Sequence, residues 1–263
     1  MKQKIKYLIF LVLSVSLLTA CNKNTPDTYA QFEGKDPQKL FIEGEQQMID
    51  GHYTDAIKTF DAIEALYPFS TSAEQAKLET IYANYKRDDM PATVTAAKQY
   101  LHLYPTSKHA DYALYMKGLA QFETSHGILS NFLPINVNER DLTNERHAFE
   151  DFTELLARYP KSPYAPDVRV RMVYLRNILA RQEIAVADYY MRREAYVAAA
   201  NRANYVVSHF DQSPEVVDAL VILVRSYHKL GMPDLSKQSM EVLVANYPEF
   251  PQTQALLKKK KKS

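Results

Sequence analysis

Side chains that could perform catalysis or bind a metal are scattered through this sequence of 263 residues. Its seven His residues form no His-Glu-x-x-His pair, and a single Cys provides no second thiolate for a zinc site. The Gly-x-Ser-x-Gly motif of hydrolases and the Gly-x-x-x-x-Gly-Lys phosphate loop are also missing from the sequence. The adjacent carboxylates of Asp88 and Asp89 fall in an expected exposed turn, where solvation accounts for them. We therefore expect a protein that is not an enzyme and that binds no metal or cofactor.

Covalent chemistry is expected at one position, Cys21. Three Lys residues precede an apolar run at residues 7–18, which is the pattern of a secretory signal peptide. This run is shorter than the roughly 20 residues that a helix needs to span a bilayer. The segment Leu18-Thr19-Ala20-Cys21 resembles the lipobox of bacterial lipoproteins. The resemblance implies cleavage between Ala20 and Cys21, a diacylglycerol on the Cys21 sulfur and acylation of the new amine. The alternative is an ordinary signal peptide with an incidental Cys.

The residues after Cys21 indicate where the protein is anchored. Asn22 follows the Cys, and in bacterial lipoproteins an Asp there favours the inner membrane, so Asn22 favours the outer one. Each buried methylene contributes about 0.8 kcal/mol, so several acyl chains anchor a protein firmly. Residues 21–36 are polar and contain Pro26 and Gly34, which is typical of a flexible tether. We expect a lipid-anchored outer-membrane protein that faces the periplasm.

The charge distribution argues against nucleic acid as a partner. The whole chain has a formal net charge of +1, which becomes −2 once residues 1–20, with their three Lys, are removed. Five of the remaining Lys form one run at residues 258–262, so the rest of the mature chain is acidic, at −7. Nucleic-acid-binding domains are basic. The 19 Tyr residues are instead typical of protein contact surfaces.

An aromatic residue followed by Pro or Asp recurs along the chain. The aromatic positions are separated by 37, 55, 51 and 37 residues, at Tyr67, Tyr104, Tyr159, Phe210 and Tyr247. Periods of this size indicate stacked helical hairpins. Such a protein is a scaffold that holds other molecules. The sequence therefore predicts an all-α solenoid; an unrelated helical bundle is the alternative.

The residues within this period resemble the tetratricopeptide repeat. Gly44, Gly51, Ala56, Phe60 and Pro68 fall at positions 8, 15, 20, 24 and 32 of its 34-residue unit. The third unit fits the same frame through Gly118, Ala148, Phe152 and Pro160. The other units fit less fully, through Ile81, Ala97, Pro105, Ala199, Ala203, Leu220, Tyr227, Gly231 and Pro248. The resemblance implies a right-handed solenoid of about five helical hairpins.

The same frame predicts an insertion and a division of the chain. The third unit has 18 extra residues between Phe122 and His147, and long insertions in repeats often carry contacts. We expect a half at residues 37–160 with units one to three, a half at 161–250 with units four and five, and a basic disordered tail at 251–263. Contact of this tail with anionic lipid headgroups is the alternative to simple solvation.

Aromatic side chains are expected on the concave face of the first three units. In tetratricopeptide repeats, positions 2, 5, 9 and 12 of each unit point there. In this chain those positions include Phe41, Tyr82, Tyr85, Tyr112, Tyr115 and Phe122. A groove lined by these rings would bind an extended peptide, since Tyr buries a ring while its hydroxyl forms hydrogen bonds. The alternative is that the rings belong to the core.

The stretch from Glu183 to Arg202 adds a more specific resemblance. Together with the lipobox, the Tyr-Pro period and the insertion, it resembles the BamD family. Members are lipoprotein subunits of the BAM complex, which inserts β-barrel proteins into the bacterial outer membrane. The resemblance implies an N-terminal half that binds unfolded barrel precursors, and a C-terminal half that docks on the POTRA region of BamA and on other BAM lipoproteins. It implies docking roles for Arg202, Tyr189 and Tyr190; from the residues alone, a solvated Arg and a half-buried Tyr pair are the alternative.

Two functions follow as hypotheses. The first is a scaffold of the β-barrel assembly machinery that binds precursors and promotes their insertion. The second is a periplasmic organiser of cell-envelope or peptidoglycan assembly, a role that other secreted tetratricopeptide proteins have. Those organisers typically carry a coiled-coil segment, whereas this chain has no sustained heptads. The first hypothesis is therefore favoured.

Overall fold

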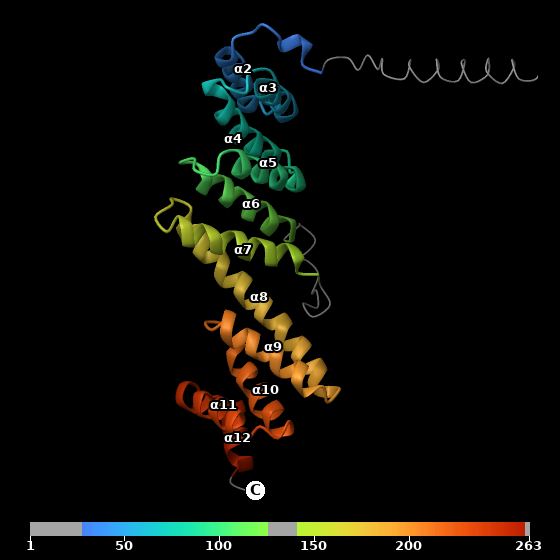
Figure 1. The fold of residues 1–263 in the computed structure, drawn as a ribbon, viewed down its shortest axis with the longest axis vertical. Coiled ribbons are helices and arrows are strands. Elements are labelled where there is room, and N and C mark those ends of the chain that lie inside the picture. Colours follow the sequence, from blue (N-terminus) through green and yellow to red (C-terminus); the bar gives the residue numbers. More distant parts are fainter. Residues whose placement is uncertain (1–27, 126–140, 261–263) are drawn as a thin grey trace, which may run out of the picture. The chain divides into compact units, whose positions relative to one another are not determined.

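The computed structural model describes residues 28–125 and 141–260, and this part of the chain is helical throughout, without a strand. A short 3-10 helix precedes the α-helices, which follow one another in the order shown in Figure 1. Their bounds are η1 Ala30–Phe32, α2 Pro37–Ile49, α3 Tyr53–Leu66, α4 Thr71–Lys86, α5 Met90–Leu103, α6 Ala110–Ser125, α7 Thr143–Arg158, α8 Ala165–Arg192, α9 Tyr196–His209, α10 Val216–Lys229, α11 Pro233–Asn246 and α12 Pro251–Lys260. The predicted all-α fold of tetratricopeptide-type hairpins is confirmed.

The aromatic-Pro positions form the same turn each time. At Tyr67, Tyr104, Tyr159 and Phe210 the helix ends, and the carbonyl of that residue accepts a hydrogen bond from the Ser three residues later. The carbonyl of that Ser then accepts a bond from the backbone N–H three residues further on, at the start of the next helix. Three of the four turns have a Pro after the aromatic residue, where the missing N–H prevents the helix from continuing. The repeated turn links the second helix of one hairpin to the first helix of the next.

Within the hairpins, side chains of small and large volume face each other. In the first compact unit, Met1–Lys77, a Cβ on Gly44 of α2 would lie 2.4 Å from the Phe60 ring of α3. In the second unit, Leu78–Ser263, a Cβ on Gly118 of α6 would lie 2.6 Å from the Phe152 ring of α7. Both rings are fully buried. Gly at position 8 therefore lets the two helices approach closely in both hairpins.

Each unit has its own hydrophobic core. The first is built around Phe60, Ile63 and Leu40, and includes the start of α4 through Ala73 and Ala76. The second has three clusters in chain order, which involve α4 to α6, then α6 to α8, then α8 to α12 together with Leu142 and Phe149. Helix α8, with 28 residues, belongs to two of them and is the longest of the described helices. The predicted functional division at residues 160 and 161 stays a prediction.

Two segments expected to be flexible are in part ordered. Phe32, in the predicted tether, is 5% exposed and packs in the first core, and its carbonyl accepts a hydrogen bond from the Tyr67 hydroxyl. Residues 251–260, in the predicted disordered tail, form α12, which begins at a Pro and packs Leu256 on the core of the second unit. Both segments are ordered for the same reason, because each has an apolar side chain that packs against a hydrophobic core. The described residues contain no helix that is both long and apolar enough to cross a membrane.

We predict that Gly118→Ala lowers the free energy of unfolding by about 1–3 kcal/mol, because the added methyl overlaps the Phe152 ring. In an exposed helix the same substitution would stabilise by about 1 kcal/mol. Urea unfolding followed by circular dichroism measures the difference. As a control, Gly118→Ala combined with Phe152→Leu should cost less than the sum of the two single changes. A Gly118→Ala protein as stable as the wild type would contradict the close packing.

Candidate functional site

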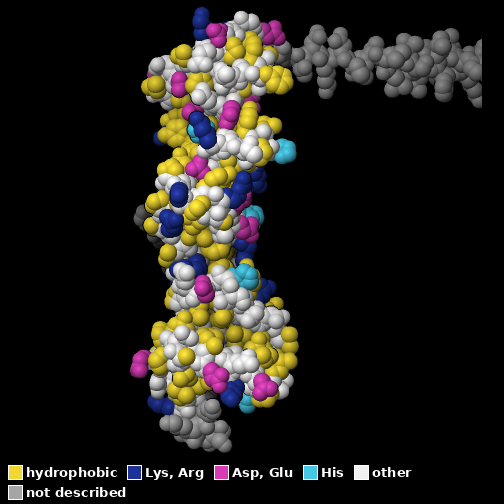
Figure 2. Space-filling view, turned by 60° about the vertical axis from the view of Figure 1, so that its left-hand side comes forward, with side chains coloured by type: hydrophobic (Ala, Val, Ile, Leu, Met, Phe, Trp, Pro, Cys, Tyr) yellow, Lys and Arg dark blue, Asp and Glu magenta, His cyan; other side chains and the backbone are white. Residues whose placement is uncertain are grey.

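Figure 2 shows hydrophobic side chains, tyrosines included, at many points of the molecular surface among charged ones. The exposed large hydrophobic residues of the second unit include Tyr82 on α4 and Val170, Val173 and Tyr174 on α8. Others are Tyr189 at the end of α8, with Val197 and Tyr205 on α9. These exposed residues fall in two regions that also contain positions singled out by the sequence.

The first region is an aromatic face formed by α4, α6 and the start of α8. We define it by Tyr82, Tyr85, Tyr112, Tyr115, Phe122 and Tyr164. Tyr82 is 40% exposed, and the other five are half-buried. The Tyr164 ring stacks on Tyr115 with ring centroids 4.6 Å apart and lies 5.8 Å from Tyr112. Five of the six groove residues expected from the sequence therefore lie in one unit, with part of each ring accessible.

Phe41, the sixth expected groove residue, lies elsewhere. It is 7% exposed and packs against the Phe60 ring, with centroids 5.7 Å apart, in the core of the first unit. The expectation of an open groove position is corrected here, because the ring fills the space beside Gly44 and Phe60. Tyr164 was missed from the sequence. The sequence signal that could have identified Tyr164 is its position two residues after Ser162 in the repeated turn.

Charged groups border the aromatic face on α8. The Tyr115 hydroxyl donates a 3.0 Å hydrogen bond to Asp167, and Arg171 donates one of 2.7 Å to the same carboxylate. The Arg171 guanidinium also lies 3.4 Å from Glu123 and 4.7 Å from the centroid of the Phe122 ring. Arg171 thus links two acidic groups and an aromatic ring at the edge of the face.

Burial changes the acidity of the tyrosines. Desolvation, reinforced by the carboxylate of Asp167, raises the pKa of Tyr115 to about 12. Burial also raises the pKa of Tyr112 well above its ordinary value, and the nearby Glu79 acts in the same direction. At neutral pH both hydroxyls are therefore protonated, and Tyr115 donates its single proton to Asp167.

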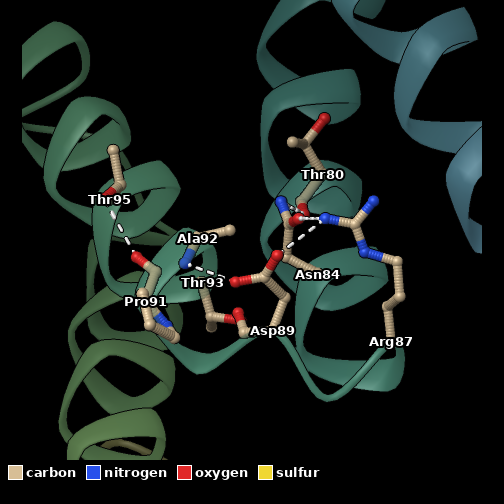
Figure 3. Close-up of polar contacts among 8 residues, drawn as sticks. All are labelled: Thr80, Asn84, Arg87, Asp89, Pro91, Ala92, Thr93 and Thr95. Atoms are coloured by element: carbon tan, nitrogen blue, oxygen red, sulfur yellow. Dashed lines mark hydrogen bonds and ion pairs between the residues drawn. The ribbon is translucent and has the colours of Figure 1, made fainter.

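The turn between α4 and α5 holds the helix that carries Tyr82 and Tyr85. Figure 3 shows buried Asn84 donating a 2.9 Å bond to the Thr80 carbonyl, while Arg87 donates to the Asn84 side chain. Arg87 also forms a 2.8 Å ion pair with Asp89, whose other oxygen accepts from the Ala92 N–H at the start of α5. One network therefore caps the start of α5 and links it to the last turn of α4. The backbone of Asp88 in this turn adopts a positive φ of 62°.

The second region contains the residues expected to dock a partner. Arg202 of α9 donates a 2.9 Å bond to Glu183 of α8, and Arg146 of α7 lies 3.6 Å from the same carboxylate. We call Arg146, Glu183 and Arg202 the arginine triad. Glu183 is only 4% exposed, whereas the Arg202 side chain is 48% exposed. Arg202 is thus not freely solvated, and sequence reasoning did not find its two partners in the triad.

The expected tyrosine pair lies at the end of α8. Tyr189 is 46% exposed, and the Arg193 guanidinium lies 5.2 Å from its ring centroid. Tyr190 packs against the core of the second unit, with its ring 5.7 Å from that of Tyr189 in an edge-on arrangement. One ring of the pair is therefore available to a partner, and the other supports it.

A cleft of about 670 Å³ lies beside the triad, between α7, α8 and the end of α9. Its lining includes Phe149, Met172, Phe210, Arg176 and Arg146, so that an apolar floor has a charged rim. Within the described part of the chain, no group of three His, Cys, Asp or Glu residues is arranged to bind a metal. Ala20, Cys21 and most of the predicted insertion lie outside the described residues.

Comparison with known proteins supports one family across the chain. The family described as YfiO, outer membrane lipoprotein, matches residues 33–243. The outer membrane protein assembly factor BamD of Neisseria meningitidis is 35% identical over 247 residues, which cover 94% of this chain and 92% of that protein. This chain belongs to the BamD family. The BamD of Vibrio cholerae is 33% identical over 235 residues, or 89% of this chain and 96% of that protein.

A solved structure with weaker similarity is the type IV pilus biogenesis factor PilW. It covers 84% of this chain and 98% of its own, at 15% identity and a TM-score of 0.36. Membership in the BamD family confirms the resemblance that the sequence motifs indicate, and it supports a role in outer membrane protein assembly.

We predict that Tyr115 remains protonated until the pH exceeds about 11, since its pKa is raised to about 12. The ultraviolet difference spectrum between wild type and Tyr115→Phe should show no tyrosinate below that pH. The stabilisation that depends on the neutral hydroxyl is complete below about pH 10, the ordinary value, and is lost as the pH rises through about 12.

The control for this titration is Asp167→Asn, which removes the second cause of the shift. Tyr115 should then ionise at a lower pH, while circular dichroism reports whether the helices are intact. A Tyr115 signal that appears near pH 10 in the wild type would contradict the burial and hydrogen bonding of this hydroxyl.

Proposed function

We propose that this chain is an outer-membrane-anchored scaffold of the β-barrel assembly machinery. In this proposal the aromatic face binds unfolded precursors of outer-membrane β-barrel proteins, and the region of Arg202 and Tyr189 docks on the POTRA region of BamA. Membership in a family of outer membrane assembly factors supports the general role. The observation that carries the specific role is the aromatic face, since it combines accessible ring surface with protonated hydroxyls.

The chemistry of the aromatic face suits an unfolded polypeptide. An extended chain presents apolar side chains together with unpaired backbone N–H and C=O groups. The half-buried rings of Tyr112, Tyr115 and Tyr164 offer apolar contact. The Tyr115 hydroxyl, which donates its proton to Asp167, can still accept a hydrogen bond from a backbone N–H. Arg171 and Asp167 supply charged groups at the edge. Because none of these contacts requires a particular side-chain sequence, the face suits many precursors that share aromatic content.

The docking region suits a folded partner with acidic groups. Arg202 is half-exposed, and its guanidinium is held at one side by Glu183. Tyr189 beside Arg193 offers a second anchor, and Tyr and Arg are residue types that dominate interface energies. In the proposal, BamA and the other BAM lipoproteins bind this half while precursors bind the aromatic face.

The proposed anchor is a lipid on Cys21 after cleavage behind Ala20. The motif and the family description as outer membrane lipoproteins support it. In the proposal the protein faces the periplasm, and a lipid anchor of this kind needs no transmembrane helix. The scaffold acts by binding alone, so the proposal includes no cofactor beyond the covalent lipid.

We predict that Tyr82→Ala together with Tyr115→Ala weakens binding of a C-terminal peptide from an outer-membrane barrel protein. Truncating two interface tyrosines that each contribute about 1 kcal/mol raises the Kd roughly 30-fold. Fluorescence anisotropy with the lipidated full chain in detergent measures it. Tyr115→Phe, which retains the ring, should account for a small part of this loss.

The matched control is Tyr205→Ala, because Tyr205 on α9 is 36% exposed, close to the 40% of Tyr82, but lies outside the aromatic face. Its Kd for the peptide should equal that of the wild type. Equal losses for Tyr205→Ala and for Tyr82→Ala alone would show that exposed tyrosine in general, and not this face, binds the peptide.

We predict that Arg202→Glu reduces recovery of BamA with the tagged chain at least tenfold, because the new carboxylate repels an acidic partner and lies beside Glu183. Co-purification from detergent-solubilised membranes gives the ratio. Arg181→Glu reverses a charge of similar exposure, 56% against 48%, and should leave recovery unchanged. Full recovery of BamA with a folded Arg202→Glu protein would refute the docking role.

A further inference from the structure

Glu183 is a buried carboxylate at the junction of three helices. It belongs to α8, its Oε2 accepts a 2.9 Å hydrogen bond from Arg202 of α9, and its Oε1 lies 3.6 Å from Arg146 of α7. Only 5% of its side chain is exposed, whereas the side chains of Arg146 and Arg202 are 37% and 48% exposed. One anion inside the protein therefore holds two cations that reach the surface.

The geometry leaves donors on both arginines free for a partner. A guanidinium has five N–H donors in a planar fork, and an interaction along one side occupies only some of them. Each carboxylate oxygen of Glu183 engages one guanidinium, so the two arginines flank the same buried group. Two positive charges against one negative charge leave the triad with a net charge of +1. An exposed, pre-oriented cationic pair of this kind matches a partner carboxylate, which accepts bidentate bonds.

We propose that Glu183 is a positioning residue that presents Arg146 and Arg202 together as a receptor for an acidic side chain of the docking partner. The inference rests on the docking role proposed above for Arg202, and it adds Arg146 as a second contact and Glu183 as their support. A free Arg side chain loses rotamer entropy when it is ordered on binding. An Arg that is already held by Glu183 loses less, so the receptor is pre-organised.

Two other roles of Glu183 make different predictions. If Glu183 only fastens α7, α8 and α9 together, its removal lowers stability and leaves the affinity of the folded protein unchanged. If only the local charge matters, the loss of a negative charge makes the site more positive and tightens binding of an acidic partner. Of the three roles, only positioning predicts that loss of the Glu183 charge weakens binding, even though this change makes the site more positive.

The test uses Glu183→Gln in the full chain and measures both the Kd for the purified periplasmic region of BamA and the midpoint of thermal unfolding. We expect the Kd to rise roughly 2- to 10-fold, which is the effect of having to order one or two long side chains on binding. Glu183→Asp, which retains the charge, should recover part of the affinity. In an Arg202→Ala background, Glu183→Gln should have a smaller effect, because only Arg146 is left to position.

The matched control is Glu215→Gln. Glu215 is also a largely buried acid, and its side chain is 12% exposed. It pairs with Arg181, which lies on the long helix α8, as Glu183 does, and is 56% exposed. This variant removes the same kind of ion pair outside the triad, so the Kd should not change. If Glu183→Gln does not fold, Arg146→Ala serves instead, because Glu183 keeps Arg202 as its partner; we expect a rise in Kd of roughly 2- to 10-fold.

The outcomes separate this inference from the docking proposal. If Arg202→Glu leaves binding intact, the docking proposal fails and the receptor fails with it. If Arg202→Glu weakens binding but Glu183→Gln leaves the Kd unchanged or lowers it, only the positioning role is refuted. An unchanged Kd for Arg146→Ala would likewise overturn the paired receptor while leaving Arg202 as a single contact.

Discussion

The close approach of two helices depends on a missing methyl group. At Gly44 and at Gly118 a side chain of even one carbon would overlap the ring of Phe60 or Phe152 on the partner helix. At each of these Gly residues, the aromatic ring of the partner helix fills the space that a side chain would occupy. The hairpin thereby buries a large apolar area. The hairpins are then linked by turns of one design, so the position of each helix follows from the one before it within a unit.

This construction explains why the candidate sites lie where they do. Small residues and Phe on the inner sides of the hairpins supply the core, so rings on other sides of α4 and α6 are left half-buried. The repeated turn also places Tyr164 at the start of α8, where its ring stacks on Tyr115. Helix α8 is long enough to border the aromatic face near Asp167 and Arg171 and to supply Glu183 and Tyr189 further along. One helix therefore contributes to both proposed binding regions.

Features set by local sequence were predictable, and features set by packing were not. The Tyr-Pro-x-Ser turns and the Gly-Phe pairs depend on a few residues at fixed spacing, so the repeat frame located them. Whether Phe41 lies in a groove or in a core depends on what covers it, and the spacing is the same in both cases. The ion pairs of Glu183 join residues 19 and 37 positions away, at Arg202 and Arg146, which no local pattern connects. Whether Phe32 and α12 are ordered likewise depends on residues distant in the sequence, against which they pack.

In the second hairpin, α4 with α5, the large and the small residue at positions 8 and 24 are exchanged. There Ile81 occupies the first position and Ala97 the second, and both are fully buried in the same cluster. The bulky partner lies on the first helix instead of the second, while the combined volume is kept roughly constant. In the evolution of this family, the large and the small residue of such a pair can change places only if both positions are substituted, because either change alone leaves a void or an overlap. Related chains should therefore show these two positions varying together.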